Sequence, residues 1–136
     1  MAFPENGTNG KSRNALIVQP DRKMSEFIAA VLSDLGFTAR IAPDSRKFVG
    51  EFTADTFDLL IFELYMDAVD GIEIILKLKD MNFSAKIILT VCGDPIMSWP
   101  VLKITETCET IVAHRVLHPL DETKIGDAVR TLFGRP

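Results

Sequence analysis

The chain has 136 residues, of which 47% are hydrophobic and 25% charged, and this length suits one compact domain. A net charge of -4 and a pI near 5.1 disfavour direct binding to nucleic acid or to an anionic membrane. No apolar run reaches the roughly 20 residues that span a bilayer. Cys92 and Cys108 show neither metal-ligand spacing nor a dense disulfide pattern, so we expect a cytoplasmic protein.

Residues 1–13 are polar and rich in glycine and asparagine, and we expect a flexible tail. In the remaining domain, residues 14–136, short apolar strands alternate with segments of helical period, which is typical of βαβ units. Strands are expected at 15–18, 37–41, 59–62, 87–91 and 116–117. Helices are expected at 22–35, from 43 through 52, from 71 through 78, from 98 through 112, and at 125–133.

Local signals support these boundaries. Ala15 to Val18 form a continuous apolar run, as in a strand buried on both faces. Asp21 is placed to cap the first helix, and Gly36 is placed to end it in a left-handed conformation. The strand at 37–41 is short and partly polar, which favours a sheet edge. The pattern predicts an α/β fold with a doubly wound, five-stranded parallel sheet in the order 2-1-3-4-5.

In such sheets, ligand chemistry lies at the carboxyl ends of the strands. Several chemically distinct residues fall there. They are Gln19, Pro20 and Asp21 after the first strand, Glu63 after the third, Thr90 in the fourth, and His118-Pro119 after the fifth.

Three segments carry a resemblance to a known family: residues 58–71, the strand that ends in Thr90, and the strand that ends in His118-Pro119-Leu120. Over residues 14–133 they resemble the receiver domain of response regulators, as in chemotaxis and other two-component systems. The resemblance implies a flavodoxin-like receiver fold and a part in phosphorelay signal transduction. It also implies a cis His118-Pro119 bond.

The resemblance assigns a family role to each of these positions. Glu63 occupies the position of the family's phosphoryl-accepting Asp. Gln19 and Pro20 occupy the positions of the acidic pair that holds a divalent metal in the family. Thr90 is the hydroxyl switch and Arg115 stands at an aromatic switch position. His118 replaces a lysine before Pro119.

These replacements remove most of the family's charge-stabilising groups. Glutamate is one methylene longer than aspartate and moves its carboxylate outward by about 1 Å, which can cost on the order of 100-fold in transfer rate. Gln19 and Pro20 offer no carboxylate to Mg²⁺, and neutral imidazole offers no fixed positive charge. We therefore expect a pseudo-receiver that is not an enzyme, takes no cofactor and acts through protein contacts.

Two roles are possible for Glu63 and for His118. Glu63 is either a solvated, idle carboxylate or an internal mimic of a charged acceptor that hydrogen-bonds Thr90. We predict the idle form, because one exposed carboxylate rarely biases a two-state element. His118 is either a tolerated replacement, which we predict, or a pH-sensitive partner of Glu63. Arg115 either reaches toward Glu63 or extends into solvent.

Ile96, Met97 and Trp99 lie close to the face that receivers use for dimerisation or partner docking, and Trp99 is either exposed there or buried. Expected partners are a histidine kinase, an output protein or a second copy of the chain. We expect the Cys92 thiol to be inert and Cys108 to lie in the core.

Two alternatives remain open. One is a divergent phosphoreceiver in which Glu63, or in its place Asp67 or Asp70, accepts phosphate while Asp21 supports Mg²⁺. The other is a flavodoxin-like enzyme. Its weakness is the loop at residues 19–22, which has no glycine to admit a phosphate against the backbone.

Overall fold

The computed structural model describes residues 13–42, 57–64, 71–80, 85–92, 96, 99–107 and 111–134. Several predictions fall outside these residues: the tail at 1–12, the helix from 43 through 52, Asp67, Asp70, Met97 and Cys108. The described elements are β1 (Arg13–Val18), α2 (Arg22–Asp34), β2 (Phe37–Ile41), β3 (Leu59–Glu63), α4 (Gly71–Asp80), β4 (Ala85–Val91), α5 (Trp99–Glu106), β5 (Ile111–Leu117) and α6 (Glu122–Phe133).

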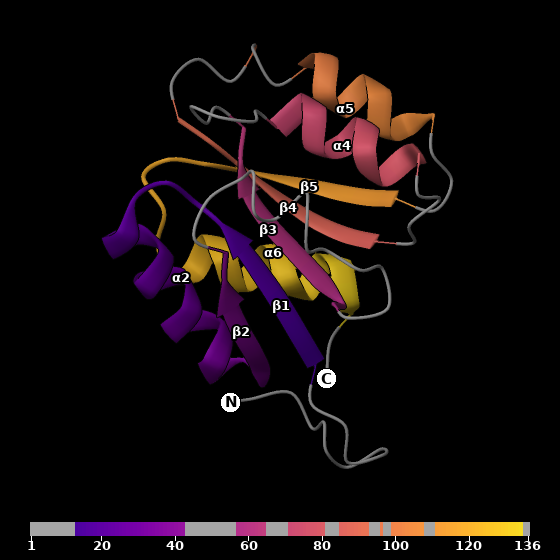
Figure 1. Cartoon of the computed structure of the whole chain (residues 1–136). Coiled ribbons are helices and arrows are strands. Elements are labelled where there is room, and N and C mark those ends of the chain that lie inside the picture. Colours follow the sequence, from indigo (N-terminus) through magenta and orange to yellow (C-terminus); the bar gives the residue numbers. More distant parts are fainter. Residues whose placement is uncertain are drawn as a thin grey trace.

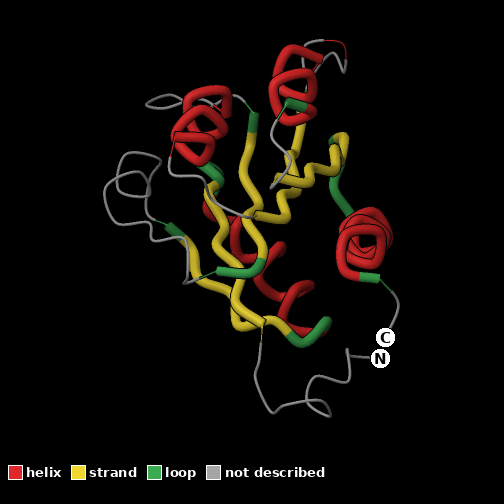
Figure 2. The backbone as a smooth tube through the Cα atoms, turned by 90° about the vertical axis from the view of Figure 1, so that its right-hand side faces the viewer, coloured by secondary structure: helices red, strands yellow, loops and turns green. Residues whose placement is uncertain are grey.

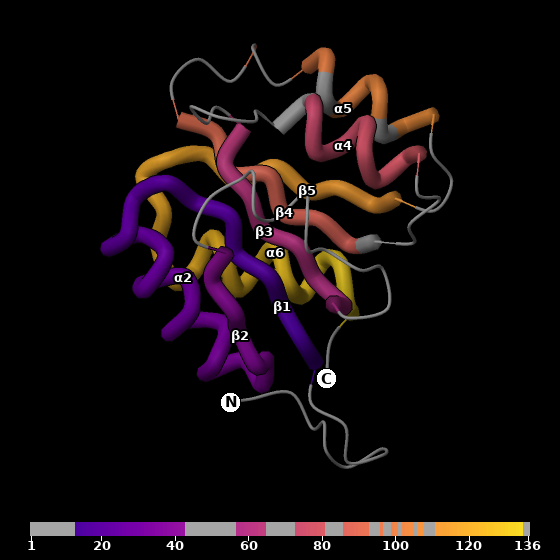
Figure 3. The backbone as a smooth tube through the Cα atoms, viewed as in Figure 1, coloured from indigo at the N-terminus to yellow at the C-terminus, as the bar shows by residue number. Residues whose placement is uncertain are grey.

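The five strands form one parallel sheet in the order β2-β1-β3-β4-β5, which confirms the predicted topology (Figure 1). The first strand, β1, lies inside the sheet. The chain then passes outward to β2 and returns across β1 to β3, as the tube in Figure 3 shows. β2 is an edge strand, as its polar residues predict. In the ladder between β3 and β4, Glu63 pairs with Thr90, so these two residues are neighbours at the carboxyl edge of the sheet.

Helices cover both faces of the sheet, which gives three layers (Figures 1 and 2). α4 and α5 lie on one face, and α2 and α6 lie on the other. Alternate residues of the central strands pack toward opposite layers: Leu16 and Val18 join one core cluster, while Ala15 and Ile17 join the other. Because both faces are buried, all residues of β3 are apolar except its last, Glu63.

The caps on the helices fix the loops that follow β1 and β5. The Asp21 side chain accepts a hydrogen bond from the backbone N–H of Met24 (3.1 Å), and Asp121 does the same for Lys124 (2.8 Å). Gly36 has a φ of 93° just after α2, as predicted for a left-handed helix end. No helix in the described part of the chain is both long and apolar enough to cross a bilayer.

One sequence prediction about the second half of the chain was wrong. The helix expected through residue 112 ends at Glu106, and Ile111 and Val112 instead begin β5. Both residues are β-branched and so favour a strand, where they pair with Ala85 and Lys86 of β4. In α4, Ile74, Ile75 and Leu78 are buried, whereas Leu76 is exposed.

Phe133, the last residue of α6, closes the layer of α2 and α6 at the amino end of the sheet. Its ring contacts two cations: the Arg13 guanidinium carbon is 4.8 Å from the ring centroid, and Lys86 Nζ is 4.6 Å from it. The Phe37 ring meets it edge-on at 5.4 Å. Contacts of these kinds each contribute about 0.5–1 kcal/mol, so Phe133 anchors the end of the helix.

Phe133→Leu is therefore expected to lower the free energy of unfolding by about 1–2 kcal/mol, because leucine keeps the apolar contact and loses the aromatic ring. Denaturant unfolding measures this loss. Phe27→Leu, at a partly buried phenylalanine of α2, gives the cost of the packing change alone. Equal losses in both variants would contradict a stabilising role for the two cations.

Candidate functional site

The carboxyl ends of four strands converge on Glu63. This residue ends β3 and is only 5% exposed. Around it lie Gln19 after β1, Thr90 and Cys92 at the end of β4, and His118 after β5. The site is therefore built where a doubly wound sheet normally places ligand chemistry, with one buried carboxylate at its centre.

The Glu63 carboxylate accepts hydrogen bonds on both oxygens. Its Oε1 accepts hydrogen bonds from Thr90 Oγ1 at 2.8 Å, His118 Nε2 at 2.8 Å and Gln19 Nε2 at 3.1 Å. Its Oε2 receives the backbone N–H of Cys92 at 3.2 Å. A buried carboxylate is costly unless donors replace the water it has lost, and these four donors do so.

The amide of Gln19 has its orientation fixed by a second contact. Its Oε1 accepts a hydrogen bond from the backbone N–H of Asp21 at 3.2 Å, which leaves its Nε2 to face Glu63. The Ser25 hydroxyl lies 3.1 Å from the carbonyl oxygens of both Gln19 and Asp21, and so holds this loop on α2. The carboxylate of Asp21 serves as the helix cap, as predicted.

His118 is held against Glu63 by its backbone. Its N–H donates to the carbonyl of Val91 at 3.0 Å, and the His118-Pro119 bond is cis, as the resemblance implied. We assign His118 Nε2 as the donor in the contact with Glu63, because the same oxygen also accepts from Gln19 Nε2, which can only donate. The imidazole therefore occupies the position expected for a lysine and donates to the same carboxylate.

The prediction of a solvated Glu63 was wrong, since neighbouring strand ends supply donors and leave it almost no exposed surface. The hydrogen bond to Thr90, which the mimic hypothesis requires, is present. His118 was predicted to be only a tolerated replacement, but its Nε2 contacts Glu63. Sequence reasoning also treated Gln19 only as a lost ligand and missed it as a donor.

The other predicted residues lie around this centre. Pro20 and Pro119 are exposed, and Arg115 is partly buried in β5 opposite Leu89. Ile96 is 62% exposed and Trp99 is 55% exposed, so the exposed alternative holds for Trp99. The Cys92 residue is exposed and its thiol is free.

The described residues around Glu63 do not fit the Mg²⁺ ion that the resemblance implies for such a site. Gln19 turns a donor, not an oxygen, toward Glu63, and Asp21 is engaged as a helix cap. Both oxygens of Glu63 already accept hydrogen bonds. Among the described residues, no group of three or more His, Cys, Asp or Glu side chains is arranged to hold a metal.

Thr90→Val is expected to lower the free energy of unfolding by about 1.5 kcal/mol, because valine keeps the shape of threonine and removes a buried donor to a charged group. Chemical denaturation checks this value. Thr131→Val is the matched control, since that exposed residue's hydroxyl bonds the carbonyl of Asp127 within its own helix. An equal, small loss at both positions would show that the Thr90 hydroxyl does not stabilise Glu63.

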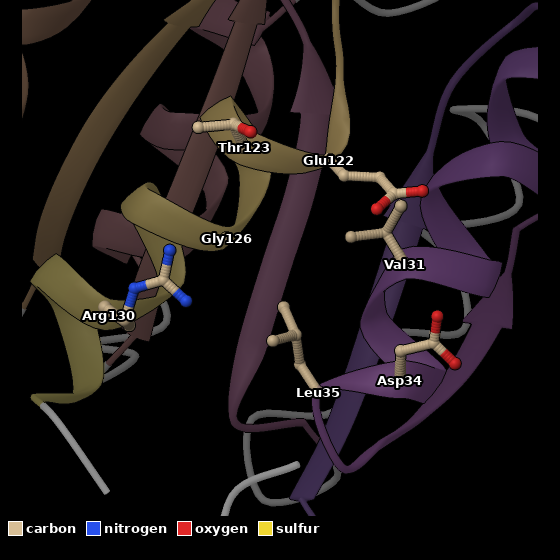
Figure 4. A pocket seen from close by; sticks show the side chains of 7 residues that line it. All are labelled: Val31, Asp34, Leu35, Glu122, Thr123, Gly126 and Arg130. Carbon is tan, nitrogen blue, oxygen red and sulfur yellow. The ribbon is translucent and has the colours of Figure 1, made fainter. Parts of the chain in front are cut away.

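A hollow of about 240 Å³ lies between α2 and α6, away from the Glu63 site (Figure 4). Figure 4 shows side chains of the two helices facing one another across it. Its lining residues are Val31, Asp34, Leu35, Glu122, Thr123, Gly126 and Arg130. Arg130 is paired with Asp127 at 2.7 Å.

The sequence matches the response regulator receiver domain over residues 15–105, and the chain belongs to this family. It is 33% identical over 76 residues to the probable transcriptional regulator ycf29 of Porphyra purpurea. That match covers 56% of this chain and 36% of the relative, so the chain spans about a third of the relative's length.

Solved structures share the fold. One is a response regulator receiver domain protein of Bacillus halodurans, with a TM-score of 0.73 and 15% identity over 93% of this chain and 99% of that one. Another is the chemotaxis protein CheY4 of Vibrio cholerae, with a TM-score of 0.70 and 13% identity over 90% of this chain and all of that one. The chain is thus a receiver domain of two-component signalling, a class of signalling modules that interact with histidine kinases and output domains.

Proposed function

We propose that this domain is an atypical receiver that transmits signals by protein contact, without stoichiometric phosphorylation at Glu63 or at another residue. The hydrogen bonding of the Glu63 carboxylate carries the proposal. Three donors converge on Oε1 and one on Oε2, so an attacking oxygen would have to break hydrogen bonds in a buried site. Phosphoryl transfer also depends on a cation to neutralise developing charge, and the residues here do not fit one.

The same contacts support a fixed signalling conformation. Glu63 touches Thr90, the hydroxyl position, and His118, the position of the family's lysine, with the same oxygen at 2.8 Å. In the family these two positions respond to the phosphoryl group. An internal carboxylate that engages both of them holds the domain in one arrangement without a phosphoryl donor.

The output of the domain is assigned to protein partners. Ile96, before α5, and Trp99, its first residue, are exposed apolar residues, and we place the binding of a histidine kinase, an output protein or a second copy of the chain in this region. The relative in Porphyra purpurea is described as a probable transcriptional regulator, which supports a place in gene regulation. The net charge of -4 favours a protein contact over direct binding to DNA. On this proposal the domain is cytoplasmic, has no enzymatic activity and needs no cofactor.

Incubation with acetyl phosphate and Mg²⁺, followed by intact-protein mass spectrometry, tests the proposal. We expect no phosphoryl mass increment under conditions that label a receiver with the usual aspartate in the same experiment. An increment that disappears in Glu63→Gln would overturn the proposal and establish the divergent phosphoreceiver. An increment that persists in Glu63→Gln would place the acceptor at another residue, such as Asp67 or Asp70, and would also overturn it.

A further inference from the structure

Lys124, near the start of α6, makes two contacts that the proposed function does not use. Its Nζ donates to the carbonyl of Pro119 at 2.7 Å and to the carbonyl of Leu117 at 3.2 Å. These two carbonyls belong to the residues immediately before and after His118. The ammonium group therefore holds the backbone on both sides of the histidine that contacts Glu63.

The position of Lys124 is electrostatically unfavourable for the helix alone. It lies in the first turn of α6, where the helix dipole disfavours a positive charge, and its long side chain loses rotamer freedom when both of its ends are fixed. Its backbone N–H is bound to the Asp121 cap at 2.8 Å. The charge-assisted bonds to the two loop carbonyls offset these costs, because a lysine ammonium offers three donors and both acceptors face it.

We propose that Lys124 is a positioning residue that fixes the loop after β5 so that His118 Nε2 meets Glu63. The family's fixed cation before the proline is absent here, and the charge that orders this loop comes instead from α6. The inference deepens the proposed function, because it concerns the same carboxylate. It requires that the Lys124 bonds, and not only the contact with Val91, determine where the imidazole lies.

The hydrogens on the His118 ring report this role directly. In the native protein Nε2 carries the proton that binds Glu63, so long-range ¹H–¹⁵N correlation spectra should show one protonated Nε2 for this ring. In Lys124→Met we expect the ¹⁵N chemical shifts of the two ring nitrogens to approach the averaged values of an imidazole that exchanges tautomers in water. Lys124→Arg, which keeps a charged donor, should restore much of the native pattern.

Lys23→Met is the matched control, since Lys23 is an exposed lysine in the first turn of α2. It removes the same unfavourable dipole interaction and should leave the His118 ring unchanged. Lys124→Gln serves as a second variant if the methionine variant does not fold. An unchanged His118 ring in a folded Lys124→Met or Lys124→Gln protein would overturn the inference. Phosphoryl uptake by the native protein would overturn the proposed function instead, so the two failures are distinct.

Discussion

Glu63→Gln is expected to lower the free energy of unfolding by about 3 kcal/mol. Glutamine has nearly the same shape as glutamate but only one acceptor oxygen. Its amide nitrogen is a donor, and it would face one of the donors that the carboxylate accepts from in the native protein. Fewer acceptor lone pairs would then remain for the donors Thr90, His118 and Gln19, inside a site that is almost closed to water. Losing bonds to a buried charge has this magnitude because the abandoned donors stay desolvated.

Urea unfolding of the native protein and of Glu63→Gln measures this loss. Glu26→Gln provides the control, since Glu26 is exposed and pairs with Arg22 at 3.4 Å on the surface of α2. An exposed pair of this kind contributes about 0–1 kcal/mol, so the control variant should stay close to the native stability. Similar small losses in both variants would mean that the bonds around Glu63 do not hold the site together.

Gln19→Glu should have a still larger effect, about 3–5 kcal/mol at neutral pH. The change replaces the donor 3.1 Å from Glu63 Oε1 with a second carboxylate, so one attractive contact becomes a repulsion between like charges in a poorly solvated place.

The double variant Gln19→Glu/Glu63→Gln separates repulsion from packing. It restores one carboxylate and one amide at the centre of the site with their positions exchanged. If repulsion causes the loss, the double variant will be more stable at neutral pH than Gln19→Glu, a coupling of more than about 1 kcal/mol in a double-mutant cycle. Additive losses would show that the loop after β1 tolerates no change for reasons of shape alone.

Most of the fold follows from the sequence because burial of both sheet faces leaves a clear pattern. The apolar runs of β1, β3 and β4 and the stripe along α2 determine which segments are strands and helices. The error at β5 has a physical origin: residues 99–112 contain apolar positions that fit a helix, and the pairing of Ile111 and Val112 with β4 is a tertiary contact.

The positions of the site were predictable, whereas its chemistry was not. The ends of parallel strands bring Gln19, Glu63, Thr90 and His118 to one edge of the sheet, and this follows from topology. Their contacts depend on side-chain lengths and on backbone donors, such as the N–H of Cys92, which leave no trace in sequence. A polar amide beside a lone carboxylate at that edge is the signal that would have identified Gln19 as a donor.

Calorimetric titration of the native protein with Mg²⁺ tests most directly whether internal donors have taken the place of the cation at Glu63. We expect no saturable heat, because Gln19 faces the carboxylate with a donor and Asp21 remains a helix cap. Gln19→Glu, which adds a second carboxylate, should gain uptake of the ion and recover stability in its presence. Saturable Mg²⁺ binding by the native protein that disappears in Glu63→Gln would contradict this account.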